Sequence, residues 1–103
     1  GWTGGAYGVG CRIKIKRTRA MVEAIHNGDF DAVDFQKDPN FGFQIPANCP
    51  GVPEAVLTPK NTWDDQQAYQ ATKSKLIALF RENFRQFEAG VNAEILAAGP
   101  VSD

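Results

Sequence analysis

Five glycines in the first ten residues, GWTGGAYGVG, constrain the fold of this chain more than any other stretch. Glycine is used where a backbone turns sharply or lies close against another group, so the run predicts a tight loop. It ends at residues 11–16, CRIKIK, where apolar and basic residues alternate with the period of two that is typical of a short half-buried strand. From Thr18 to Asn27 the period becomes that of a helix. The opening therefore predicts a glycine-rich loop, a short strand and a helix.

The predicted helix carries its own start and stop signals. Thr18 is placed to cap its N-terminus, and Asn27-Gly28 tolerates the left-handed conformation that ends helices. Its apolar stripe consists of Met21, Val22 and Ile25. Among the glycines before it, we interpret Trp2 and Tyr7 as buried aromatic anchors of the loop, with ring platforms for a ligand as the alternative.

Two short alternating runs follow, VDFQK and FGFQIP, on either side of the turn signal Asp38-Pro39-Asn40. They predict an antiparallel hairpin with one buried face. The next stretch, ANCPGVPEAVLTPKN, contains prolines that exclude any long regular element, so it is expected to be an extended strap with one helical turn at Glu54 to Leu57.

The longest helix of the chain is expected after the strap. Thr62 and Asp65 have the spacing of a capping box, and apolar residues then recur every three or four positions up to Ala89-Gly90. These residues are Tyr69, Leu76, Ile77, Leu79, Phe80, Phe84 and Phe87. Such a face needs a partner, and we interpret it as core or domain packing, not a ligand site. A short final helix that ends near Gly99-Pro100 and a loose tail are expected to complete the chain.

Charge and cysteine content exclude several classes of function. The net charge is -1, so no global attraction to nucleic acid or to an anionic membrane is expected. Locally, five of the eleven Lys and Arg residues lie between Arg12 and Arg19, which alone is also compatible with a solvated strand edge. Cys11 and Cys49 lie far apart without a CxxC motif, so neither a zinc site nor a disulfide framework is predicted, and a cytoplasmic location is expected. Without an initiator Met, the 103 residues are expected to be a segment of a longer protein.

Three motifs in order resemble one enzyme family. GWTGGAYGVGCRIKIKRTRA and, from Pro39 to Trp63, PNFGFQIPANCPGVPEAVLTPKNTW are similar to the C-terminal part of ATP-dependent phosphoenolpyruvate carboxykinases, and the last long helix matches in position and character. The resemblance implies that residues 1–103 are the C-terminal part of a nucleotide-binding domain. The implied fold class is an α+β segment of an α/β mononucleotide-binding domain.

Enzymes of that family convert oxaloacetate and ATP to phosphoenolpyruvate, ADP and carbon dioxide in gluconeogenesis, with magnesium and manganese as metals. Their P-loop residues, metal ligands and oxaloacetate-binding arginine match no motif here. No catalytic or metal-binding residue is therefore assigned in this segment, which is expected to be inactive without the upstream remainder of the enzyme. No nucleic acid or membrane partner is expected.

What the resemblance does imply is a nucleotide-binding role for Arg12, Ile13 and Thr18, which match the family pattern GxR(I/M)xxxxTR. A guanidinium can stack on adenine or pair with phosphate, a backbone group of Ile13 can meet the base edge, and Thr18 offers a hydroxyl. Cys11 departs from the Lys, Ser or Thr common at its position, which alters the polarity of the loop.

Each residue also has a purely structural interpretation: Arg12 as a solvated strand residue, Ile13 as core and Thr18 as a helix cap. For the whole chain, the alternatives are a free-standing nucleotide-binding module with a self-contained core, and a dimer formed through the aromatic helix.

Overall fold

The computed structural model describes residues 1–103, and its first thirteen residues form a tight hairpin, here called the glycine hairpin. Strand β1 (Trp2–Thr3) pairs antiparallel with β2 (Cys11–Arg12), with Trp2 opposite Arg12 and Thr3 opposite Cys11. The prediction of a strand over residues 11–16 is wrong beyond Arg12. The glycine loop folds back on so short a strand that only two residues find a pairing partner, and the chain then enters a helix.

Helix α1 (Ile15–Asn27) begins three residues before the predicted cap. Its N-cap is Lys14, whose side chain makes no capping hydrogen bond, so the prediction that Thr18 caps the helix is wrong. The predicted end is confirmed: Gly28 adopts a φ of 75°, and its N–H donates to the carbonyls of Ala24 and Ile25.

A short 3-10 turn, η1 (Asp29–Ala32), leads into the predicted hairpin, which is confirmed. Strand β3 (Phe35–Lys37) pairs antiparallel with β4 (Gln44–Pro46), and Gln36 lies opposite Ile45. The Asp38 carboxylate closes the turn by accepting hydrogen bonds from the N–H groups of Asn40 and Phe41. The expected buried face is wrong, because β3 is exposed throughout, β4 is only half-buried at Ile45 and Pro46, and Phe43 is 69% exposed.

The strap contains the predicted helical turn, α2 (Glu54–Leu57), followed by a 3-10 turn, η2 (Pro59–Thr62). Helix α3 (Gln66–Phe84) is the longest element, as predicted. Its cap is not Thr62 but Asp65, whose carboxylate accepts from the N–H groups of Gln67 and Ala68. A 3-10 segment, η3 (Arg85–Gly90), and α4 (Ala93–Ala97) follow, and α4 ends just before Gly99-Pro100 as expected.

Very little of this chain is buried. One small cluster joins Ala24 of α1 to Cys49 and Val52 of the strap, and Ile77 of α3 is buried separately. Burial, with the Asp29 carboxylate as a second cause, raises the pKa of the Cys49 thiol. The predicted stripe of α1 is only partly correct, because Val22 and Ile25 are exposed.

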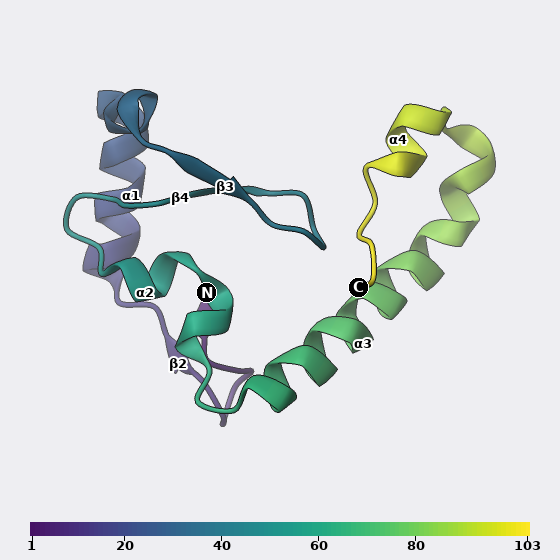
Figure 1. Cartoon of the computed structure of the whole chain (residues 1–103), viewed down its shortest axis with the longest axis horizontal. Helices are drawn as coiled ribbons and strands as arrows, with labels where there is room; N and C mark the ends of the chain where they lie inside the picture. Colours follow the sequence, from purple (N-terminus) through teal and green to yellow (C-terminus); the bar gives the residue numbers. More distant parts are fainter.

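The elements are arranged as two arms. Helix α3 runs away from α1, α2 and the glycine hairpin, whereas the turn of the β3–β4 hairpin points toward α3 (Figure 1). The chain then returns through α4 to a C-terminus that lies beside α3 (Figure 1). The radius of gyration is 15.7 Å, whereas a compact domain of this length has about 13 Å. The prediction of a mixed helix-and-strand segment is confirmed. None of its helices is long and apolar enough to cross a membrane.

Candidate functional site

The three predicted nucleotide contacts lie where the glycine hairpin joins α1. Arg12 is the last residue of β2, Ile13 follows it, and Thr18 lies in the first turn of α1. The Arg12 and Thr18 side chains are exposed, and Ile13 is half-buried. The structural interpretations of Ile13 as core and of Thr18 as a cap are therefore not supported at this junction.

Several polar groups of these residues are unused. The two ion pairs of the chain join Lys73 to Asp103 and Arg85 to Glu82, so the Arg12 guanidinium is in neither. The Thr62 hydroxyl is the only threonine hydroxyl that makes a hydrogen bond, so the Thr18 hydroxyl makes none.

Only one of the two backbone groups of Ile13 is free to contact a ligand. Its N–H donates to the carbonyl oxygen of Gly1 at 2.9 Å, which closes the open end of the glycine hairpin. No backbone N–H of the chain donates to the Ile13 carbonyl oxygen. Of the two backbone groups considered from sequence, only the carbonyl is available, and it can accept from an exocyclic amine such as that of adenine.

The electrostatics of this junction favour anions. Helix α1 has no acidic residue in its first turn and no side-chain cap, so the positive end of its dipole is uncompensated. The five basic residues between Arg12 and Arg19 add to that field. A phosphate or other anion nearby would be stabilised by both.

Close backbone packing sets the shape of the glycine hairpin. A Cβ atom at Gly10 would clash with the carbonyl oxygens of Thr3 and Gly5, so only glycine fits there. The interpretation of Trp2 and Tyr7 as buried anchors is wrong. Their rings contact each other edge-on with centroids 5.4 Å apart, and Tyr7 is 86% exposed.

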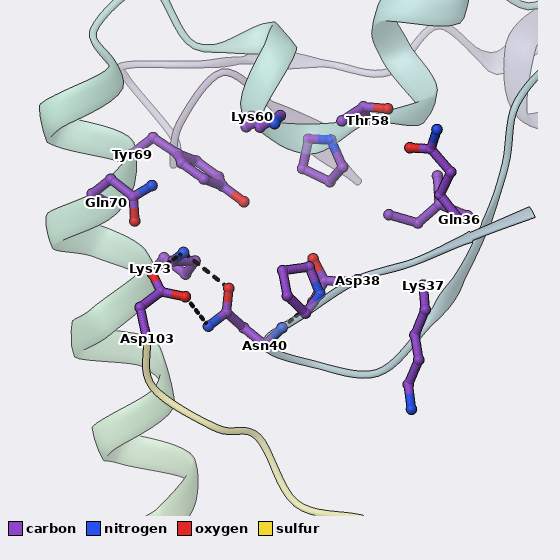
Figure 2. Close-up of a pocket in the computed structure, with 13 residues that line it drawn as sticks. Gln36, Lys37, Asp38, Asn40, Thr58, Lys60, Tyr69, Gln70, Lys73 and Asp103 are labelled. Carbon is purple, nitrogen blue, oxygen red and sulfur yellow. Dashed lines mark hydrogen bonds and ion pairs between the residues drawn. The ribbon is translucent and has the colours of Figure 1, made fainter.

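A second, polar pocket of about 290 Å³ lies between the β3–β4 turn, the strap and α3. In Figure 2, Asn40 of the β3–β4 turn faces both Lys73 of α3 and Asp103 of the tail, which lie next to each other. The Lys73 ammonium donates to Asn40 Oδ1 and to Asp103 Oδ2, each at 2.9 Å. Asn40 Nδ2 donates to the Val101 carbonyl at 2.8 Å and to Asp103 Oδ1 at 2.9 Å. We call Asn40, Lys73, Val101 and Asp103 the tail latch.

The tail latch overturns the prediction of a loose tail. Asn40 is only 4% exposed, and the Lys73 side chain is 9% exposed. The Lys73 ammonium, and secondly the Asn40 amide, hold the pKa of the Asp103 carboxyl below its usual value. The carboxylate is therefore ionised at neutral pH, and the tail is fixed to both arms of the chain.

An apolar groove of about 600 Å³ lies beside this pocket. Its apolar lining comes from the β3–β4 hairpin, the strap, α3 and the tail: Phe41, Phe43, Ile45, Leu57, Trp63, Leu76, Phe80 and Pro100. Leu76, Leu79 and Phe80 remain about half exposed on α3. The chain therefore covers this face of α3 only in part, at Ile77 and where Phe41 contacts Phe80.

The residues present do not fit a metal site. No group of three or more His, Cys, Asp or Glu side chains in the chain could hold a metal ion. Both cysteines are free thiols, Cys11 exposed and Cys49 buried.

Sequence reasoning missed two arrangements. The tail latch joins residues 30 to 63 positions apart, and Thr62 bonds to Gly4 across 58 positions. No periodicity or spacing signals such pairs. The one available hint was polar residues in otherwise apolar stretches, Asn40 beside Phe41 and Lys73 on the aromatic helix.

Comparison with known proteins matches the chain to one group of enzymes. A family model described as phosphoenolpyruvate carboxykinase matches residues 1–55. Several relatives are named phosphoenolpyruvate carboxykinase (ATP). The relative from Dictyostelium discoideum is 48% identical over 98% of this chain and 18% of its own length. The relative from Geotalea uraniireducens is 53% identical over 92% of this chain and 18% of its own length. That of Flavobacterium johnsoniae is 47% identical over 100% and 19%. The chain thus spans under a fifth of the length of these relatives.

Proposed function

The chain belongs to the phosphoenolpyruvate carboxykinase family, and we propose that it supplies the adenine end of the nucleotide site in a larger ATP-dependent enzyme. That enzyme would convert oxaloacetate and ATP to phosphoenolpyruvate, ADP and carbon dioxide, a step of gluconeogenesis in the cytoplasm. The segment would form the C-terminal part of its mononucleotide-binding domain.

The observation that carries the proposal is the set of unused groups at one junction. The Arg12 guanidinium would stack on the base or pair with phosphate, the Ile13 carbonyl would accept from the exocyclic amine, and the Thr18 hydroxyl would complete the contact. The positive end of α1 would attract the nucleotide's negative charge.

The strength of these contacts limits what the segment does alone. Stacking by Arg12 contributes about 2 kcal/mol when desolvated, and each of two hydrogen bonds adds about 1 kcal/mol. A total of about 4 kcal/mol corresponds to a dissociation constant of about 1 mM before any entropic cost. The segment would therefore contribute to ATP affinity within the enzyme but bind ATP barely by itself.

Magnesium and manganese, the metals that the family implies, do not fit the residues present. Neither the phosphoryl transfer nor the decarboxylation can be assigned to side chains of this segment. Both steps would rest on residues in the remaining length of the enzyme, which would also hold oxaloacetate.

The exposed apolar groove supports a segment of a larger enzyme over a free-standing module. A module would need its own core, yet only five residues are buried. We expect the rest of the same enzyme to cover the apolar face of α3 and the groove, since burying apolar area stabilises by about 25 cal/mol per Å².

Photolabelling with 8-azido-ATP tests the nucleotide site directly in the complete enzyme. The label is expected on the peptide spanning residues 11–18, with its yield falling as unlabelled ATP is added. Oxaloacetate alone should leave that yield unchanged. Labelling confined to other parts of the enzyme would refute the proposed contact.

A further inference from the structure

One side chain ties the glycine hairpin to the rest of the chain. The Gly4 N–H donates to Thr62 Oγ1 at 2.9 Å, and the Thr62 hydroxyl in turn donates to the Pro59 carbonyl at 2.7 Å. The hydroxyl thus uses one acceptor site and its only proton. Valine has nearly the same shape but could make neither bond.

No other hydrogen bond joins residues 1–13 to any residue after α1. The approach is also sterically close. Gly4 has a φ of 76°, and a Cβ atom built on it would lie 2.7 Å from the Thr62 carbonyl oxygen. The backbone of the glycine hairpin therefore lies directly against the backbone of η2. The hydrogen bond from the Gly4 N–H to the Thr62 hydroxyl holds the hairpin there.

The contact is mechanically linked to Arg12. Gly4 directly follows Thr3, which pairs with Cys11, the neighbour of Arg12. The loop between the strands is closed by hydrogen bonds from the N–H groups of Val9 and Gly10 to the Ala6 carbonyl, at 3.0 and 2.8 Å. A short hairpin closed in this way moves as one body, so a shift at Gly4 is transmitted to Arg12.

We propose that Thr62 is a positioning residue for nucleotide binding: its hydroxyl holds the glycine hairpin against the strap and thereby fixes Arg12. This inference rests on the proposed function, because it requires Arg12 to contact the nucleotide. Thr62 itself touches no nucleotide and acts only through the hairpin.

The test compares Thr62→Val and Thr62→Ser in the complete enzyme. Losing the hydroxyl should raise the KM for ATP about fivefold, since a neutral hydrogen bond contributes about 1 kcal/mol and 1.4 kcal/mol is tenfold. The KM for oxaloacetate and kcat should change less than about twofold. Thr62→Ser keeps the hydroxyl and should retain the native KM. Thr72→Val, the same chemical change on α3 at a hydroxyl that makes no hydrogen bond within the chain, is the matched control.

Hydrogen exchange at the Gly4 amide provides a second readout, and it should accelerate in Thr62→Val but not in Thr62→Ser. Equal losses in the valine and serine variants, or equal increases in both KM values, would overturn the positioning role. If Arg12→Ala raises the KM for ATP and Thr62→Val does not, the inference fails while the proposed function stands. If Arg12→Ala also has no effect, the proposed function fails first.

Discussion

Replacing Asn40 with alanine should release the C-terminal tail from the β3–β4 turn. The Asn40 side chain makes two hydrogen bonds to the tail, donating to the Val101 carbonyl and to Asp103 Oδ1. It also accepts from the Lys73 ammonium of α3. It is 4% exposed, so water does not replace these bonds while the tail stays docked. The variant therefore weakens the tail latch at its centre, where one amide serves two segments.

The size of the effect follows from the two bonds to the tail. At about 1 kcal/mol net for each, the docked tail loses about 2 kcal/mol, which is about a thirtyfold shift toward the released state. The Val101 N–H, which donates to the Asn40 carbonyl at 2.8 Å, reports that release. Its hydrogen exchange should accelerate by about the same factor.

Hydrogen exchange with mass spectrometry on peptides containing Val101 measures this change. Asn48→Ala removes the same group from an exposed position of the strap and should leave Val101 unaffected. A Val101 exchange rate within about threefold of the native rate in Asn40→Ala would refute the role given to the tail latch.

Three further outcomes are expected. Because the pKa of Asp103 is lowered in the folded chain, its stabilising effect is complete above the ordinary value of 3.8, and protection of Val101 should fall only as the pH drops below that value. Gly10→Ala should clash with the Thr3 and Gly5 carbonyls and open the glycine hairpin, which would be seen as faster hydrogen exchange of the amide at position 10. Gly90→Ala is the control, because a Cβ atom there meets nothing. Equal exchange rates at position 10 in the two variants would contradict the steric argument. The purified 103-residue chain should form no phosphoenolpyruvate from oxaloacetate and ATP, and any turnover above a no-protein blank would contradict the assignment of catalysis to the remaining length.

Local signals predicted the elements whose causes lie within a few residues. Gly28 ends α1, Asp38 closes the hairpin turn, and the prolines confine the strap to one helical turn, because each depends on backbone preferences that neighbours do not override. The family motifs likewise indicated the enzyme class, because they are contiguous runs of residues that the sequence displays directly.

Predictions that depended on a residue far away in the sequence were wrong. The alternation of residues 11–16 favours a strand, yet no segment pairs beyond Arg12, so helix α1 begins there. Neither threonine that was predicted as a helix cap is one in the structure. Thr18 lies inside α1, and the Thr62 hydroxyl bonds to Gly4 instead. A capping motif indicates which local hydrogen bond a side chain can make. It does not indicate which distant donor the fold will place beside that side chain.

The candidate site was predictable only as a set of residues. The family pattern pointed to Arg12, Ile13 and Thr18, but only the structure shows that the Ile13 N–H is already bonded to Gly1. The tail latch was beyond sequence reasoning, because its members come from three elements whose meeting depends on the whole fold.

The proposed function requires that Arg12 contact the nucleotide, and steady-state kinetics of Arg12→Ala in the complete enzyme test that contact. The KM for ATP should rise about thirtyfold, as the loss of a desolvated cation–π or phosphate contact of about 2 kcal/mol requires, while the KM for oxaloacetate stays within about twofold. Arg85→Ala, which removes the same charge from an exposed position just after α3, should leave both values near native. Equal increases for the two substrates, or no change for ATP, would contradict the claim.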